Sequence, residues 1–292
     1  MNSNLLEKIE TYNALVNKKM EEYIYNSNIP SDIQNVIAYS VFAGGKRLRP
    51  AILLASCELF GGKTEKALPY ACAIEFIHTY SLIHDDLPAL DNDDYRRGKL
   101  TSHKKFGEDI AILAGDALLS YAFEIMLEAS CDMSGILASR YIANAAGIKG
   151  MVAGQWVDVK SNGEKIDFEK MKYIHLNKTA AMIIGAAKAG AVCGGADLAD
   201  VDLMGEYAKE IGYTFQIVDD ILDVIGDSDE LGKKVGSDEL NNKTTYVTLF
   251  GLDGAKKQAE EHTKLAIKLL EKFGVKAEFF IELSKYLLNR KK

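Results

Sequence analysis

The chain has 292 residues, of which 48% are hydrophobic and 26% charged, and its net charge is -7. This length allows one large hydrophobic core or two small ones, and the negative charge argues against a nucleic-acid partner. The four cysteines, Cys57, Cys72, Cys131 and Cys193, are widely scattered, which is typical of buried thiols in a reducing compartment. We find no signal-peptide pattern and no charge-free apolar run of about 18 residues, so we expect a cytoplasmic protein without a membrane span.

Helical periodicity dominates the sequence, and the low proline content permits it. Residues 30–32 indicate a helix start, with Ser31 or Asp32 as the capping residue. The only stretch with strand-like alternation is 155–159, and it is short. We therefore predict a single all-α domain over residues 1–292, with roughly ten or more helices.

Residues 67–86 are apolar almost all round, which predicts a buried central helix. The polar residues His78, Ser81 and Asp85 are spaced three and four apart, so they share one face of that helix. The stretch therefore predicts a helix whose one polar stripe ends in an aspartate.

An acidic cluster, Asp85, Asp86 and Asp91, follows at the end of this predicted helix. Residues six apart do not converge on a straight helix, and Pro88 disrupts the backbone hydrogen bonds between them. We therefore expect the helix to end or bulge there, with Asp91 returning to Asp85 from irregular backbone. The alternative for Asp91 is a simple acidic turn.

A second acidic cluster, Asp219, Asp220 and Asp223, lies in the predicted helix 206–225, which also has one polar stripe. Burying several unpaired carboxylates costs several kcal/mol or more, because they repel one another and lose water. Two such clusters favour a site for hard cations, Mg²⁺ or Mn²⁺, over two solvated acidic turns.

Cationic residues near both clusters indicate that the metal would act on phosphate. Residues 43–50 combine a glycine pair with three cations, and an arginine fork matches phosphate oxygens. Further cations follow the two aspartate clusters or open an alanine-rich helix: Arg96, Arg97, Lys178, Lys233 and Lys243. The stretch 43–50 is not a Walker A loop, and a basic surface turn is its alternative.

The chain resembles the trans-isoprenyl diphosphate synthases, and most closely the bacterial farnesyl diphosphate synthases. The motifs that carry the resemblance are, in chain order, GGKRLRP, SLIHDDLPALDNDDYRRG, HLNKTA, FQIVDDILDVIGD, LGKKVGSD and NNKTTY. The resemblance implies an isoprenoid-synthase-type helical bundle around a deep central cavity, usually as a homodimer. It also implies Mg²⁺-dependent elongation of dimethylallyl and geranyl diphosphate with isopentenyl diphosphate, giving (2E,6E)-farnesyl diphosphate.

The resemblance assigns roles to residues that match the family motifs. Asp85, Asp91 and Asp219 would bind about three Mg²⁺ ions, or Mn²⁺, supported by Asp86, Asp220 and Asp223. The allylic diphosphate would contact Arg96, Lys178, Thr179, Gln216, Lys233 and Lys243. Isopentenyl diphosphate would contact Lys46, Arg49, His78 and Arg97. The basic tail 289–292 either folds over that second pocket or is solvated.

Product length would depend on Tyr80 and Ser81, which precede Asp85 on the helix. A tyrosine at that position, with four residues between Asp86 and Asp91, resembles the bacterial farnesyl pattern. We therefore expect the C15 product, with C20 geranylgeranyl diphosphate as the alternative. The alternative for Tyr80 is a role in core packing only.

Three other classes fit the sequence less well. A class I terpene cyclase would have a different second acidic motif and no basic loop such as 44–50. A non-catalytic partner subunit would lack some of the aspartates or cations, and none is missing. A carrier with an apolar cavity would not need two acidic clusters.

Overall fold

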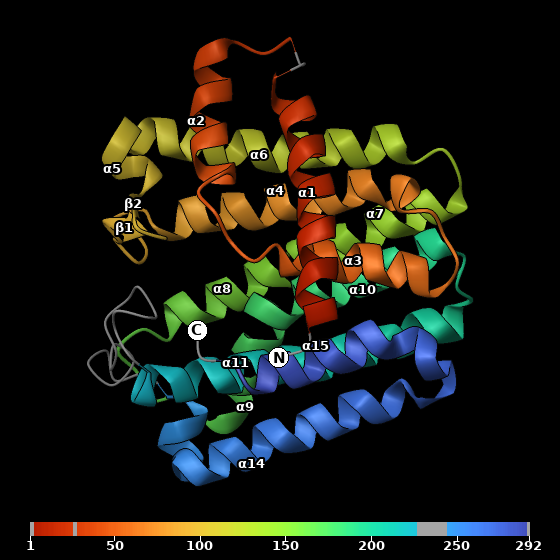
Figure 1. The fold of residues 1–292 in the computed structure, drawn as a ribbon. Coiled ribbons are helices and arrows are strands. Elements are labelled where there is room, and N and C mark those ends of the chain that lie inside the picture. The colour runs from red at the N-terminus through yellow and green to blue at the C-terminus, as the bar shows by residue number, and fades with distance from the viewer. Residues whose placement is uncertain (1–2, 26–27, 227–243, 291–292) are drawn as a thin grey trace.

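The computed structural model describes residues 3–25, 28–226 and 244–290. The described chain is almost entirely helical, as predicted (Figure 1). The helices of the first half are α1 (Ser3–Tyr25), α2 (Ser31–Val41), α3 (Leu48–Leu59), α4 (Thr64–Asp85), α5 (Ser102–Phe106), α6 (Glu108–Ala129) and α7 (Met133–Ala146). Those of the second half are α8 (Met151–Lys160), α9 (Phe168–Ile174), η1 (His175–Ala180), α10 (Ala181–Gly194), α11 (Leu198–Ile225), α14 (Tyr246–Leu269), η2 (Glu271–Ala277) and α15 (Glu278–Leu288).

Most of the helices run side by side across the view in Figure 1, from α6 near the top to α14 at the bottom. Helices α1 and α2 cross this stack. The main pairs in contact are α4 with α6, α3 with α10, and α11 with α14. Helix α4 is therefore covered by neighbours, which agrees with its prediction as a buried central helix.

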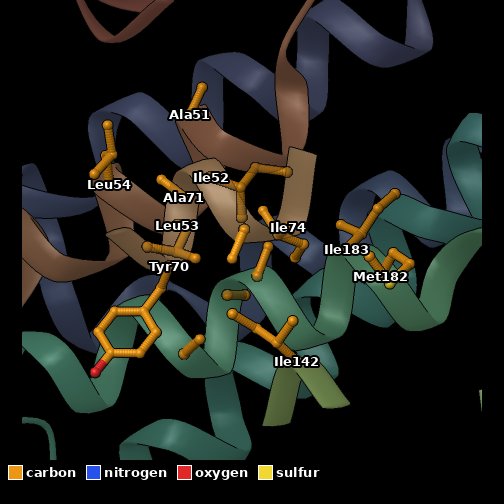
Figure 2. Packing of buried hydrophobic residues seen from close by; sticks show 14 of the residues in the cluster. Ala51, Ile52, Leu53, Leu54, Tyr70, Ala71, Ile74, Ile142, Met182 and Ile183 are labelled. Atoms are coloured by element: carbon orange, nitrogen blue, oxygen red, sulfur yellow. The ribbon is translucent and has the colours of Figure 1, made fainter. Parts of the chain in front are cut away.

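The core consists of apolar side chains from several helices (Figure 2). Ile52 on α3, Ile74 on α4 and Ile183 on α10 are fully or almost fully buried. Each such side chain contributes about 1.5–3 kcal/mol when it leaves water. The approach of α10 to α3 requires Gly190, because a Cβ atom there would lie 2.0 Å from the Leu53 carbonyl oxygen.

The structure decides one stretch that the sequence left ambiguous, and it differs from the sequence in two local features. Residues 155–159 belong to α8, since the short alternation also fits a helix with a half-buried face. Helix α2 does begin at Ser31, but neither Ser31 nor Asp32 caps it with a side-chain hydrogen bond. A two-stranded hairpin, β1 (Tyr95–Arg96) with β2 (Lys99–Leu100), was not expected.

Among the described helices, α6 is long and apolar enough to cross a membrane by length and composition. However, 39% of its most apolar window is buried inside the protein, largely against α4. Core helices of soluble proteins have the same character, so α6 does not show a membrane span.

The structure also has a surface pocket of about 490 Å³ between α1, α3 and α15. It is lined by residues remote in sequence from both aspartate clusters. The deep central cavity and the assignment of residues 1–292 to one domain stay predictions.

Candidate active site

The first aspartate cluster lies at the end of α4. Asp85 is the last residue of this helix and Asp86 is its C-cap. The following backbone is irregular, and the Asp91 amide donates to the Asp85 carbonyl at 2.9 Å. The amide of Asn92, whose φ of 54° is left-handed, donates to the Leu87 carbonyl at 3.1 Å. The turn returns Asp91 to Asp85, which confirms the expected break around Pro88.

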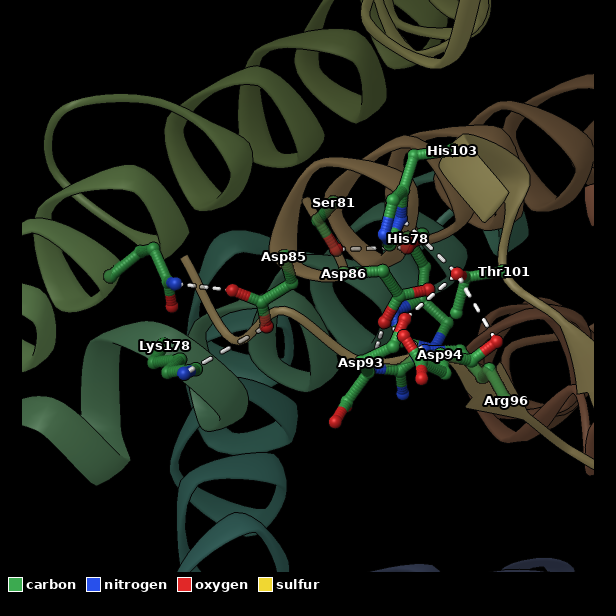
Figure 3. Close-up of polar contacts among 11 residues, drawn as sticks. His78, Ser81, Asp85, Asp86, Asp93, Asp94, Arg96, Thr101, His103 and Lys178 are labelled. Carbon is green, nitrogen blue, oxygen red and sulfur yellow. Dashed lines mark hydrogen bonds and ion pairs between the residues drawn. The ribbon is translucent and has the colours of Figure 1, made fainter. Parts of the chain in front are cut away.

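The Asp85 carboxylate faces cationic and amide groups from two other helices. Nζ of Lys178, on η1, lies 3.9 Å from its Oδ2 and 2.7 Å from Oδ2 of Asp158 on α8. The side-chain amide of Gln155, also on α8, donates to Oδ1 of Asp85. Figure 3 shows Asp85 pointing toward Lys178.

The pKa of Asp85 is raised to about 6, mainly because the carboxyl group is buried. Lys178 opposes this rise, and the nearby Asp91 adds to it. Asp85 is therefore an acid whose charge is only partly compensated by its protein neighbours.

Sequence reasoning missed Gln155 and Asp158. They are three residues apart, so on a helix they share a face. Their stretch was examined only as a possible strand, in which the two would point to opposite faces. A helix predicted over this stretch would have placed Gln155 and Asp158 on one face, as a candidate polar pair.

Asp86 points to the other side of the helix end and is only 3% exposed. Nε and Nη2 of Arg96, at the end of strand β1, lie 2.7 and 2.5 Å from its Oδ1. Burial raises the pKa of Asp86, and Arg96 opposes the rise. Arg96, which the resemblance assigns to the allylic diphosphate, is thus paired with Asp86 of the first aspartate cluster.

The second cluster lies near the end of α11, and its aspartates differ in surroundings. Asp219 is partly exposed, and Nη2 of Arg290 lies 2.5 Å from its Oδ1. Asp220 is buried and accepts the Tyr246 backbone N–H at 2.8 Å, which ties it to the start of α14. Asp223 is also buried. Asp220 therefore differs from Asp219 in that its carboxylate holds the start of α14 against α11.

The donors fit a hard cation in their chemistry, since Asp85, Asp91 and Asp219 offer only carboxylate oxygens. Positive side chains, Lys178 and Arg290, contact two of these carboxylates. Within the described ranges, however, no three acidic, histidine or cysteine side chains lie close enough together to hold a metal ion. Helix η1, which carries Lys178, packs against both α8 and α11.

A cationic cluster of four arginines from outside α4 lies around His78, which is about two turns before Asp85 on that helix. The pKa of His78 lies well below its usual value, first because of burial and then because of Arg49, Arg97, Arg47 and Arg96. Of the four residues predicted for isopentenyl diphosphate, Arg49, His78 and Arg97 thus gather here. The fourth, Lys46, is exposed on the adjoining loop.

Gly45 makes room for one of these cations. The Arg97 guanidinium donates to the Gly44 carbonyl, and a Cβ atom on Gly45 would lie only 2.7 Å from its Cζ. Nε of Arg49 is buried and has no hydrogen-bond partner in the structure. A buried N–H without a partner is costly, and an anion bound here would satisfy it.

The remaining predicted residues divide into three groups. Thr179 on η1 and Gln216 on α11 are half-buried. Lys233, Lys243 and the last two residues of the basic tail lie outside the described residues. Arg290 does not extend toward the isopentenyl diphosphate pocket, as the folded-tail alternative expected, but contacts Asp219.

Tyr80 and Ser81 occupy the α4 turn before Asp85. Tyr80 is 7% exposed, belongs to the apolar core and packs edge-on against His84, with ring centroids 5.7 Å apart. The Ser81 hydroxyl donates to the His78 carbonyl at 2.8 Å, within the same helix.

The chain matches a known protein family. The family model for polyprenyl synthetase matches residues 30–279, which is most of the chain. The protein belongs to the polyprenyl synthetase family. This membership confirms the resemblance found in the sequence, and with it prenyltransferase activity.

Named relatives of this polyprenyl synthetase make products of different length. It is 46% identical over 283 residues to a chloroplastic geranylgeranyl pyrophosphate synthase of Capsicum annuum, covering 94% of this chain and 76% of the relative. It is 47% identical over 257 residues to a farnesyl diphosphate synthase of Geobacillus stearothermophilus, covering 86% of each chain.

The fold comparison agrees. An FPP/GFPP synthase from Zymomonas mobilis superimposes with a TM-score of 0.87 at 34% identity, covering 99% of this polyprenyl synthetase and all of that chain. The all-helical fold class predicted from the sequence is thereby confirmed.

Proposed function

We propose that this polyprenyl synthetase elongates an allylic diphosphate by condensing it with isopentenyl diphosphate in a Mg²⁺-dependent reaction. One observation carries the proposal. The buried helix α4 ends at Asp85, with Asp91 in the turn that follows, and about two turns earlier its His78 lies among arginines from α3, from the residue before α3 and from the β1–β2 hairpin. Two oppositely charged sites at this separation suit two diphosphates, one held through metal and one held by arginines.

Mg²⁺ held by Asp85, Asp91 and Asp219 would supply Lewis-acid stabilisation to the leaving diphosphate. Lys178 lies beside Asp85 and would neutralise part of the charge on that diphosphate. The allylic C–O bond breaks, and the double bond of isopentenyl diphosphate attacks the allylic carbon to form the new C–C bond. Loss of a proton to the departing diphosphate restores an alkene.

Arg49 and Arg97 would hold the diphosphate of isopentenyl diphosphate. His78 would donate or accept a hydrogen bond as a neutral imidazole, because its pKa is lowered far below neutrality. A neutral ring between guanidinium groups adds no further positive charge to the cluster.

For the product, the names of the relatives support geranylgeranyl diphosphate (C20) better than the farnesyl diphosphate expected from the sequence. Farnesyl diphosphate remains the second candidate because the buried Tyr80 ring lies in the turn of α4 before Asp85. A growing chain that passes along α4 away from the acidic end would meet this ring.

The test is to incubate the pure protein with Mg²⁺, isopentenyl diphosphate and dimethylallyl diphosphate, and to size the dephosphorylated alcohols by chromatography. Geranylgeraniol as main product supports the C20 proposal, and farnesol supports the second candidate. A folded protein that forms no condensation product contradicts the proposed function.

We further propose a homodimer formed through the outward faces of α6 and α7. Ile112, Leu113 and Leu127 on α6 and Ile136 on α7 are large apolar side chains exposed to solvent, and a second copy of the chain would remove them from water. Sedimentation equilibrium would test this, since Leu113→Glu should shift a dimer toward monomer. A cytoplasmic location also remains a proposal, to be tested by cell fractionation.

A further inference from the structure

A buried ion pair anchors the loop that carries Lys46 and Arg49. Nη1 of Arg47 lies 2.7 Å from Oε1 of Glu75, and the two side chains are only 4% and 3% exposed. Nη2 of Arg47 also donates to the carbonyl of Val41, the last residue of α2. Since Arg47 directly precedes α3 and Glu75 lies in α4, one side chain ties three helices together.

Arg47 differs in this respect from the other cations of its loop. Residues 43–50 contain three cations, of which the resemblance assigns Lys46 and Arg49 to isopentenyl diphosphate and gives Arg47 no role, and the structure turns Arg47 into the core. It is therefore not available to touch a substrate, and its role has to be indirect.

The backbone of the loop depends on this side chain. Arg47 has a φ of 48°, in the left-handed region that side-chain-bearing residues seldom adopt. Such a conformation persists only where the surroundings hold it. The bonds of Arg47 to Glu75 and to the Val41 carbonyl are the contacts that hold it, and they thereby fix the backbone between Lys46 and Arg49.

Glu75 also acts on the neighbouring cations. It lies one turn before His78 on α4 and opposes the lowering of pKa that burial causes at Arg49 and at Arg97. Its carboxylate is thus a shared counter-charge for Arg47, Arg49 and Arg97. Without a counter-charge, three guanidinium groups this close would repel one another and separate.

We propose that Glu75 and Arg47 are positioning residues, which set the placement of Lys46 and Arg49 for the diphosphate of the non-allylic substrate. The inference rests on the proposed function, because it takes isopentenyl diphosphate as that substrate. Cations held in place bind a diphosphate more tightly than mobile ones, since less conformational freedom is lost on binding.

The test is the double variant Arg47→Met/Glu75→Gln, which removes one positive and one negative charge and so leaves the net charge of the cluster unchanged. Replacing both partners of a buried ion pair with neutral side chains of similar volume is often tolerated by a fold. We expect the KM for isopentenyl diphosphate to rise about tenfold, while kcat and the KM for the allylic diphosphate change less than about twofold.

Ile74→Ala is the matched control. Ile74 is fully buried beside Glu75 on the same helix, so this variant destabilises α4 without touching the loop. It should lower the melting temperature and leave the KM for isopentenyl diphosphate unchanged. If both variants raise this KM in proportion to their loss of stability, or if the double variant leaves it unchanged, the positioning role is wrong.

A second variant, Glu75→Asp, keeps both charges and shortens the contact by one methylene group, so it serves if the double variant does not fold. We expect a smaller rise in the same KM, of about threefold, at unchanged kcat. Calorimetric titration of each variant with isopentenyl diphosphate alone gives an independent readout. A wild-type protein that binds this ligand but forms no product would contradict the proposed function, while the affinities of the variants still decide the positioning role.

Discussion

Arg290, near the C-terminus, covers Asp219 of the second aspartate cluster. Its Nη2 atom lies 2.5 Å from Oδ1 of Asp219 and 2.8 Å from the Phe215 carbonyl oxygen, and its guanidinium stacks over the Phe215 ring. The Arg290 side chain is only 5% exposed. The Arg290 guanidinium is thus paired with the Asp219 carboxylate, which the proposed reaction assigns to a metal ion.

Removing this contact should therefore ease metal binding. We predict that Arg290→Ala lowers the Mg²⁺ concentration needed for half-maximal activity by about two- to fivefold, because a partly exposed ion pair contributes about 1 kcal/mol or less. Activity measured across a Mg²⁺ titration checks this. Lys285→Ala, which removes an exposed ion pair with Glu282 on α15, is the control and should leave the titration unchanged. A higher Mg²⁺ requirement in Arg290→Ala would mean that Arg290 assists the site.

Asp85 should be essential for activity as a metal ligand. Asp85→Asn removes a proposed metal ligand, and we predict a loss of about 10²–10³ in kcat under saturating Mg²⁺. Near-wild-type turnover in this variant would contradict the metal role. Gln155→Leu removes a neighbour of Asp85 but no carboxylate, so its loss should be smaller.

The raised pKa of Asp85 gives this residue a pH-dependent effect on stability. Its folded pKa of about 6 exceeds the model-peptide value of 3.8, so the folded state binds the proton more tightly than the unfolded state. The resulting stability is complete below about pH 4 and is lost as pH rises through about 6, amounting to about 1–3 kcal/mol. Thermal unfolding in chelator should show Asp85→Asn gaining stability over wild type across this window. An unchanged difference between pH 4 and 7 would contradict the assignment.

Gly45 and Gly44 form a matched pair of sites for one substitution. Both have positive φ, 124° and 98°, so alanine strains the backbone at either position. Only at Gly45 would the new Cβ meet the Arg97 guanidinium, whereas nothing lies within 4 Å at Gly44. We predict that Gly45→Ala raises the KM for isopentenyl diphosphate about tenfold more than Gly44→Ala does. Equal KM values would show that Arg97 does not bind that substrate.

Tyr80 should limit product length. Tyr80→Ala removes its buried ring and is predicted to shift the product distribution toward longer chains, whichever length the wild type makes. Tyr70→Ala, another buried tyrosine on α4, controls for the cost of about 3–5 kcal/mol that such a cavity brings. Chromatography of the alcohols from both variants gives the answer, and an unchanged distribution in Tyr80→Ala would leave Tyr80 a core residue only.

Much of the site could be predicted from the sequence because its signals are local. The helical class follows from periodicity along each segment. The break at Pro88 and the return of Asp91 follow from the geometry of one turn, since proline lacks the N–H that a helix needs. The grouping of His78 and Asp85 on one face of α4 follows from helical spacing alone.

Contacts between distant segments were beyond such reasoning. Gln155 reaches Asp85 from a helix 70 residues later, Asp158 on the same helix contacts Lys178, and Arg290 reaches Asp219 across 71 residues. Sequence spacing carries no information about which helices will pack together at these separations. Likewise, nothing local distinguishes Arg47, which turns inward to Glu75, from its neighbours Lys46 and Arg49.

The sequence by itself determined the helices, the two acidic clusters, the cationic loop and the family to which they belong, because each depends on residue types at short spacing. Only the tertiary structure decided which charge meets which partner. In the folded protein Asp220 accepts a hydrogen bond from the start of α14, Asp86 forms an ion pair with Arg96, and Arg47 forms one with Glu75. The physical reason is that burial makes an unpaired charge costly, so each charged side chain adopts the partner that packing brings near, whatever its distance along the chain.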